Sequence, residues 1–182
     1  MTFAHDVESG LQSAVWLANS DDEPDALTTT ADLATFFREH GYSGRIDGTR
    51  AELEEVRALR PRLREVLVAD EVRAVALVNE MLVEASALPQ LVRHDGHDWH
   101  VHAVASDRPL AERIVVETAM AMTDVIRLGE LSRLATCADE ECDGVVLDLS
   151  RNRSRRFCST ACGNRNAVAA YRERQQSRSA TD

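Results

Sequence analysis

The four cysteines of the chain stand in two pairs near its C-terminal end. Four residues separate Cys137 from Cys142, three separate Cys158 from Cys162, and fifteen lie between the pairs. Two close pairs at this separation are typical of a site in which four thiolates hold one zinc ion. Four protein ligands complete the tetrahedral coordination of zinc and leave no position for a reacting water. The pattern therefore predicts one structural zinc rather than a catalytic one.

Disulfide bonding is the alternative use of clustered cysteines. The first residues, MTFAHDVESG, lack the basic and apolar regions of a signal peptide, and no apolar run approaches the roughly 20 residues that cross a bilayer. We therefore expect a cytoplasmic protein with no membrane contact. Its compartment is reducing and disfavours disulfides, so metal binding is the favoured interpretation.

Arginines gather around the same cysteines. Residues 1–150 carry 13 arginines against 29 acidic residues, a net charge of −16, whereas residues 151–182 carry 8 arginines against two acidic residues, a net charge of +6. A basic patch beside a rigid zinc site is the charge pattern of nucleic-acid binding. A solvated basic surface, or one that docks on the acidic N-terminal part, remains an alternative. The candidate nucleic-acid contacts are Arg151, Arg153, Arg155, Arg156, Asn164, Arg165, Asn166, Arg172 and Arg174.

The elements that position these residues follow from the local pattern. We expect a knuckle at Cys137 to Cys142, a strand over 145–149, a returning strand over 155–157 and a helix that begins at Cys162. This is the layout of a treble-clef zinc module. A segment of about 40 residues buries too little apolar surface to fold alone. Structural zinc contributes roughly 10 to 16 kcal/mol in finger peptides, so the metal must supply much of the stability.

The sequence as a whole predicts a helical domain over 1–134, a zinc finger over 135–176 and a flexible tail over 177–182. The fold class is mainly α, of the α+β type, with one β-hairpin in the helical domain. Apolar periodicity and capping residues predict helices within 1–20, 31–40, 50–69, 71–86 and 110–134. Thr30, Thr49 and Asp70 are the expected N-caps, Glu52 completes a capping box with Thr49, and Pro61 should kink or split its helix.

Several side chains of this domain have two open interpretations. The helix over 71–86 is expected to bury Val72, Val75, Val78 and Leu82, with Met81 and Val83 widening that stripe. Asn79 at its edge is either a satisfied core amide or a pocket residue. An arginine group in 57–64 is favoured as a solvated surface paired with glutamates, with a ligand or phosphate contact as the alternative. Its members are Arg57, Arg60, Arg62 and Arg64.

A hairpin is predicted over 90–105, because Asp95 and Gly96 lie between two alternating runs. Four histidines lie on or beside it. A solvated polar face is favoured over a second metal site, since no cysteine or well-spaced carboxylate completes a ligand set. These histidines are His94, His97, His100 and His102.

The tetrapeptide Cys162-Gly163-Asn164-Arg165, within the run LDLSRNRSRRFCSTACGNR, resembles the signature of the CGNR zinc finger. In that family the finger follows a domain described as a stress-induced transcription regulator, the ABATE domain, and the acidic helical first part of this chain is similar to it. The resemblance implies a bacterial DNA-binding regulator with structural zinc on the four cysteines. The sequence departs from the family pattern at Val146, where an aromatic residue is common, and at Ala167, where a basic one is common.

The leading interpretation is a zinc-dependent DNA-binding transcriptional regulator that responds to stress or to a ligand. The alternative is a finger that binds a protein or RNA without sequence-specific DNA binding. No enzyme is expected, because the sequence has no phosphate loop, no nucleophile elbow and no metal triad with an open position. DNA is the expected partner. The N-terminal domain could also form a homodimer or bind a small molecule, and the sequence decides neither.

Overall fold

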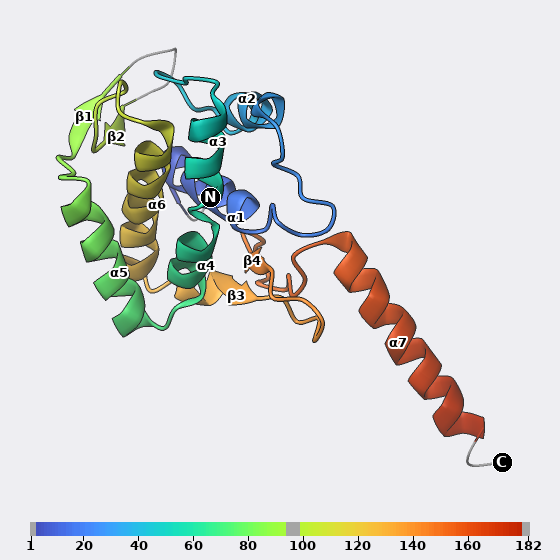
Figure 1. Cartoon of the computed structure of the whole chain (residues 1–182). Coiled ribbons are helices and arrows are strands. Elements are labelled where there is room, and N and C mark those ends of the chain that lie inside the picture. Colours follow the sequence, from blue (N-terminus) through green and yellow to red (C-terminus); the bar gives the residue numbers. More distant parts are fainter. Residues whose placement is uncertain (1–2, 94–98, 180–182) are drawn as a thin grey trace.

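The computed structural model describes residues 3–93 and 99–179. It shows a group of packed helices from which one long helix projects (Figure 1). The predicted fold class is confirmed: the protein is mainly helical, with two small two-stranded sheets. The elements are α1 (His5–Ala18), α2 (Thr30–Glu39), α3 (Arg50–Arg57), α4 (Arg60–Val68), α5 (Glu71–Glu84), β1 (Gln90–Val92), β2 (His100–His102), α6 (Leu110–Arg127), a 3₁₀ turn (Leu131–Arg133), β3 (Leu134–Thr136), β4 (Val145–Leu147) and α7 (Thr160–Ser179).

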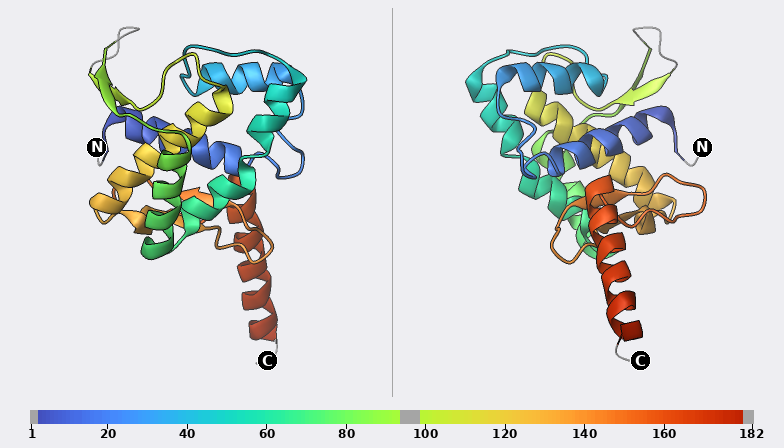
Figure 2. Two further views of the ribbon diagram at one scale, coloured as in Figure 1. Left: turned by 60° about the vertical axis from the view of Figure 1, so that its left-hand side comes forward. Right: turned by 90° about the vertical axis from the view of Figure 1, so that its right-hand side faces the viewer.

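The core lies around α6, which packs between α1 and α5 (Figures 1 and 2). The fully buried large side chains include Leu11 of α1, Phe36 of α2 and Met122 of α6. Gly129 adopts φ +66° just after α6, a left-handed conformation that glycine tolerates, and the chain turns there toward β3. We call the part before Leu134 the helical body and the part from Leu134 to Ser179 the finger. None of the helices within the described residues is long and apolar enough to cross a membrane.

Capping residues begin the helices largely as expected. Thr49 accepts a hydrogen bond from the Glu52 amide (3.2 Å), and Asp70 caps α5 through the Arg73 amide (2.9 Å). Pro61 stands in the first turn of α4 and divides α3 from α4, which confirms the predicted split.

Two details of the predicted caps were wrong. The cap of α2 is Thr29 rather than Thr30, and it forms a reciprocal capping box with Asp32. The Glu52 carboxylate does not bond the Thr49 amide. It accepts hydrogen bonds from the amides of Asp47 (2.9 Å) and Gly48 (2.8 Å), and so closes the loop one residue earlier.

The buried face of α5 matches the predicted one only in part. Val78 and Met81 are buried and Leu82 packs against the core, as expected. Val72 and Val83 are 81% and 77% exposed, and Asn79 is exposed, so it is neither a core amide nor a pocket residue. Apolar residues occur on several sides of this helix, and the stripe at i, i+3, i+4 and i+7 that faces the core shares Val78 and Met81 with the predicted face. Its members are Ala74, Leu77, Val78 and Met81.

The hairpin over 90–105 is confirmed. Strands β1 and β2 pair antiparallel, with Leu91 opposite Val101. The predicted Asp95-Gly96 turn, His94 and His97 lie outside the described residues. The idea of a histidine metal site is therefore untested, and His100 and His102 are placed only by their positions in β2.

The arginine group of residues 57–64 is largely paired inside the body. Arg60 is buried, and its Nη2 lies 2.7 Å from Asp25. Arg57 pairs with the same carboxylate (3.1 Å), Arg64 with Asp21 (2.7 Å) and Arg62 with Glu84 (2.7 Å). These arginines tie the loop after α1 and the end of α5 to α3 and α4.

The strand pairing of the finger was predicted wrongly. β4 pairs antiparallel with β3, from Leu134 opposite Leu147 to Thr136 opposite Val145, and residues 155–157 form no strand. A single backbone hydrogen bond joins Ala138 to Arg156 (2.9 Å). The Asp148 carboxylate accepts a hydrogen bond from the Arg155 backbone amide (2.7 Å), which holds residues 155–157 as a loop.

This small sheet belongs to the core of the body as much as to the finger. Leu134, Val145 and Leu147 are buried in the main apolar cluster, where the sheet contacts α1 and α4. The amide of Asn19, just after α1, also pairs with Val145: its Oδ1 accepts from the backbone N–H (2.7 Å) and its Nδ2 donates to the carbonyl (2.9 Å). The finger is therefore fixed to the body by strand packing and by a side chain that continues the sheet.

Candidate metal centre and nucleic-acid surface

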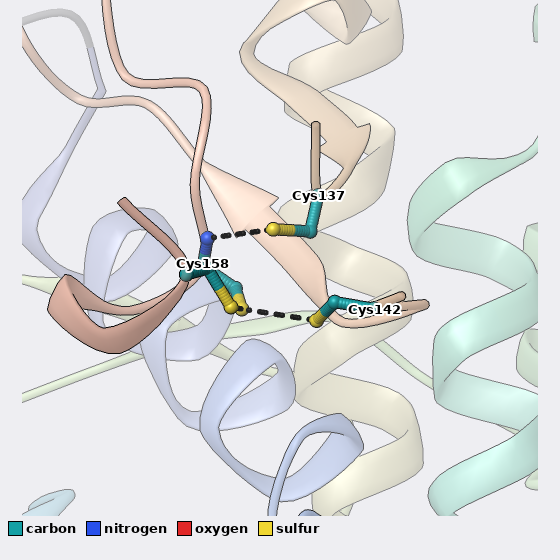
Figure 3. A group of neighbouring side chains, drawn as sticks. Cys137, Cys142 and Cys158 are labelled. Carbon is teal, nitrogen blue, oxygen red and sulfur yellow. Dashed lines mark hydrogen bonds between the residues drawn. The ribbon is translucent and has the colours of Figure 1, made fainter. Parts of the chain in front are cut away.

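The four cysteines come together at one point, as their spacing predicts. Their sulfur atoms all lie within 4.8 Å of one another. Cys137 follows β3, Cys142 ends the knuckle, Cys158 follows the loop after β4, and Cys162 lies in the first turn of α7. Figure 3 shows the sulfurs of Cys137, Cys142 and Cys158 directed toward one another.

The sulfur separations fit a metal rather than a disulfide. The Cys142 and Cys158 sulfurs are 3.5 Å apart, those of Cys158 and Cys162 are 3.6 Å apart, and all four cysteines are free thiols. A tetrahedral zinc with Zn–S bonds of about 2.3 Å would place its sulfurs about 3.8 Å apart, whereas a disulfide needs about 2.05 Å. The donor set and its geometry are consistent with one structural zinc ion.

Electrostatics lead to the same conclusion. Desolvation raises the pKa of Cys158, and the neighbouring thiols Cys142 and Cys162 raise it further. Desolvation also opposes ionisation of Cys137, but the amides of Cys158 and Asp139 bring the pKa of that thiol below its ordinary value. Four thiols this close cannot all ionise beside one another without a cation among them. Zinc supplies that charge.

Backbone and side-chain donors surround the sulfurs. The Cys158 amide donates to Cys137 Sγ and the Gly144 amide to Cys142 Sγ, both at 3.4 Å. Arg165 Nη2 donates to Cys162 Sγ (3.2 Å). Such donors offset the negative charge of a four-thiolate zinc and orient its ligands. Gly144 also makes room, because a Cβ there would lie 3.0 Å from Cys158 Sγ.

Two residues predicted to contact nucleic acid make bonds that hold the finger together. Arg165 pairs with the buried carboxylate of Asp139 in the knuckle (2.7 Å). Although desolvation raises the pKa of Asp139, the Glu141 amide and the Arg165 guanidinium lower it below its usual range overall. Asn166 donates through Nδ2 to the Cys162 carbonyl (3.1 Å). The first turns of α7 are thereby tied to the knuckle.

Two more of the predicted arginines have partners within the protein. Arg153, at φ +49°, contacts both carboxylate oxygens of Glu130 (2.8 Å each) and reaches Ser132 (3.2 Å). Arg155 donates to the carbonyls of Phe157 (3.3 Å) and Cys158 (3.0 Å). Both guanidinium groups stabilise the loop between β4 and α7.

Five of the predicted residues remain exposed, with no side-chain partner among residues 3–93 and 99–179. Three of them, Asn164, Arg172 and Arg174, lie on α7, which extends away from the body in every view (Figures 1 and 2). The other two, Arg151 and Arg156, lie on the loop that leads to Cys158. These five residues are the part of the predicted set whose side chains have no partner within the described residues.

Sequence reasoning missed the residues that support this site. Arg133 is buried and donates to the carbonyls of Asp148 (2.9 Å) and Ser150 (3.2 Å), and Asp148 in turn accepts the Ser150 amide (2.8 Å). An aspartate that caps the amide two residues on is a recognisable turn signal, so Asp148 could have been found. The role of Asn19 depends on a contact 126 residues away, which leaves no local sequence signal.

Two family models match the chain. One is the ABATE family, described as "Putative stress-induced transcription regulator", over residues 12–138, and the other is the CGNR zinc finger, over residues 133–175. The chain belongs to the ABATE family. Its C-terminal part is a CGNR zinc finger, as the Cys162-Gly163-Asn164-Arg165 signature indicates. No curated protein matches the chain. The two matched ranges overlap in residues 133–138, which contain β3.

Proposed function

We propose that this ABATE-family protein is a zinc-dependent, DNA-binding transcription regulator in which α7 and the preceding loop contact DNA. The observation that carries the proposal is the placement of α7. This helix begins at the four cysteines and projects from the body with arginines that have no protein partner within the described residues. A projecting basic helix fixed at one end is the form in which many proteins enter a DNA groove.

The positions of the open arginines suit a groove. Residues two apart on a helix point about 200° apart, so Arg172 and Arg174 would reach opposite walls of phosphates. Arg151 and Arg156 would add contacts beside the start of the helix. Arginine suits both phosphates and guanine edges because its planar guanidinium donates in pairs. Elsewhere in the protein most arginines are already paired with carboxylates, including Arg45, Arg50, Arg57, Arg60, Arg62, Arg64, Arg73 and Arg108.

In this proposal the zinc has a positioning role. Cys137, Cys142, Cys158 and Cys162 hold it, and it fixes the direction of α7 relative to the body. Bound zinc would supply no chemistry beyond this, because four thiolates fill its coordination sphere. The protein would act in the cytoplasm without a catalytic step.

Salt dependence of DNA binding tests the proposal. Anisotropy of a labelled duplex is measured against zinc-loaded full-length protein at several salt concentrations. Four arginine–phosphate contacts predict a slope of log K against log[salt] of about −3.6. The Arg172→Gln/Arg174→Gln variant should bind more weakly, with a slope of about −1.8. Arg50→Gln, on the exposed surface of α3, is the matched control and should bind like the parent. Absence of duplex binding at low salt would refute DNA binding.

A protein partner is the second candidate, and one observation favours it. Val168 and Tyr171, three residues apart on α7, are 48% and 58% exposed, and they form a short apolar stripe on the projecting helix. Helices often bind partners through such spacing. Val168→Ser/Tyr171→Ser should leave the salt slope unchanged if α7 binds DNA through its arginines. The second candidate is favoured if the parent protein does not bind the duplex and if this variant no longer binds a protein that the parent binds specifically.

A further inference from the structure

A cleft of about 570 Å³ lies where the finger meets the helical body. One side is formed by α1 and the loop after it, through Val15, Trp16 and Ala26. The other side is formed by β4 and the segment that follows, through Leu147 and Leu149. Its volume falls in the range of about 300 to 1,000 Å³ that is usual for small-molecule pockets.

The body side of the cleft is a fixed aromatic wall. The Trp16 ring is half-buried and packs on Phe36 (5.1 Å between ring centroids) and on His40 (5.6 Å). Val15 beside it is also half-buried against the core. Because the indole is held from behind, it can present a flat apolar surface to a ligand at little cost in side-chain entropy.

Most polar groups of the cleft are already satisfied. Both amide atoms of Asn19 are used by Val145. The Ser20 hydroxyl donates to the Leu17 carbonyl (2.8 Å) and accepts from Arg60 (2.9 Å). The Asp148 carboxylate accepts the amides of Ser150 and Arg155. The exposed Gln12 also lines the cleft, and its amide has no hydrogen-bond partner within the described residues. A ligand therefore finds few polar groups left to bind, and most of its surface must be apolar.

The positive group at the rim is Arg155. Its Nε and Nη2 donate to backbone carbonyls, and Nη1 has no partner among the described residues. Asp148, the acidic residue that lines the cleft, accepts amide hydrogen bonds on both of its carboxylate oxygens. The groups left for a ligand are therefore an apolar wall, the Arg155 guanidinium as a cationic donor and the neutral amide of Gln12.

We propose that this cleft binds a small aromatic acid, a flat ring system that carries one carboxylate or sulfonate. The ring lies against Trp16 and the aliphatic side chains opposite it, and the acid group accepts from Arg155. The inference goes beyond DNA binding and does not depend on it. Because the two walls belong to the body and to the finger, such a ligand bridges the two parts, and through Arg155 it contacts the loop that carries Cys158.

Two naphthalene dyes test the proposal on the zinc-loaded full chain. The probes are 8-anilinonaphthalene-1-sulfonate, which has the ring and the anion, and N-phenyl-1-naphthylamine, which has the ring alone. The Trp99→Phe background leaves Trp16 as the only tryptophan, since the chain has two. We expect saturable binding of one sulfonate dye per chain with quenching of Trp16 emission, and binding of the neutral dye at least about tenfold weaker.

Substitutions in the cleft separate its two features. Ala26→Phe fills the cleft and should weaken the binding of both dyes at least tenfold. Arg155→Gln should weaken only the sulfonate dye, to the level of the neutral one, while Arg127→Gln on the surface of α6 changes neither. Zinc content and helical circular dichroism of each variant show that it is folded.

Dye adsorption on the exposed face of α5 is the outcome that would overturn the proposal. Val72→Ser/Val83→Ser should leave dye binding unchanged if the cleft is the site. The proposal fails if this variant loses the dye while Ala26→Phe keeps it. It also fails if folded Arg155→Gln binds both dyes like the parent. DNA binding enters none of these measurements, so either proposal can fail alone.

Discussion

The helical body and the finger are stabilised by different kinds of interaction. The body has a large apolar core in which side chains such as Leu11, Phe36 and Met122 are fully buried. Among the described residues, the finger's own cluster has Cys137, Val146 and Cys162 as buried members, with Phe157 and two further cysteines partly buried against it. Burial of one large apolar side chain contributes about 1.5 to 3 kcal/mol. Apolar burial is therefore sufficient to stabilise the body. The finger buries too few apolar side chains, so the bound metal must supply most of its stability.

Removal of one thiol should therefore have the largest effect, and one confined to the finger. Cys158→Ser should lower the zinc content from about one per chain to near zero and cost the finger most of the roughly 10 to 16 kcal/mol that structural zinc contributes. Metal analysis and circular dichroism measure the two effects. The helices of the body should remain, and Ser154→Ala should keep its zinc. If Cys158→Ser kept its full zinc content, or lost all of its helical signal, the body and the finger would not be stabilised separately in this way.

A substitution in the apolar core should destabilise the body and leave the finger unaffected. Phe36→Ala, in a fully buried position of α2, should lower the free energy of unfolding of the body by about 3 to 5 kcal/mol and leave zinc binding intact. Urea denaturation followed by circular dichroism gives the value. Val72→Ala, on the exposed face of α5, is the control and should change it by less than about 0.5 kcal/mol.

The acidic groups of the two parts should respond to pH in opposite directions. Desolvation raises the pKa of Glu117 on α6 from 4.5 to about 7. Desolvation also acts to raise the pKa of Asp139 and Asp148 in the finger, but hydrogen bonds and nearby arginines lower the pKa of both below its usual range. Between about pH 4.5 and 7 the folded body keeps a proton on Glu117 that the unfolded chain has released. Stability should therefore fall as pH rises, by on the order of 2 kcal/mol.

Glu117→Gln should remove this slope, and Asp124→Asn, at a half-exposed position of the same helix, should not. The measurement is urea denaturation at intervals from pH 5 to pH 8. The two finger aspartates act in the other direction, because their stabilisation is lost only as pH falls below about 4. An unchanged slope in Glu117→Gln would place the titrating group elsewhere.

The junction between the two parts should show the smallest effect. Asn19→Ala removes two hydrogen bonds to Val145 and should destabilise the sheet by about 1 to 2 kcal/mol. Hydrogen exchange at the Val145 amide should become faster while zinc stays bound. Asn79→Ala on the exposed face of α5 is the matched control. Equal exchange in both variants would show that strand packing alone fixes the finger.

The features predicted best from sequence depend on residues close together in the chain. Cysteine spacing predicts the cluster because each pair closes a short loop around one point, and Thr49, Asp70 and Pro61 act on the backbone next to them. Features that depend on distant partners could not be predicted. Nothing in the sequence indicates that Arg153 pairs with Glu130 or that Arg165 pairs with Asp139, because the fold alone brings those carboxylates beside the arginines. The inward stripe of α5 was a choice between two apolar faces that periodicity alone does not separate.

The sheet of β3 and β4 limits how the protein can be divided. A cut between residues 134 and 135 would part Leu134 from Leu147 across the sheet and expose Val145, which the body core now covers. A finger grafted onto another protein would carry an uncovered apolar strand with it. A helical body expressed alone would have a groove where that strand had been. The unit that can be transplanted is the whole chain, and a hybrid regulator would have to exchange α7 rather than the finger.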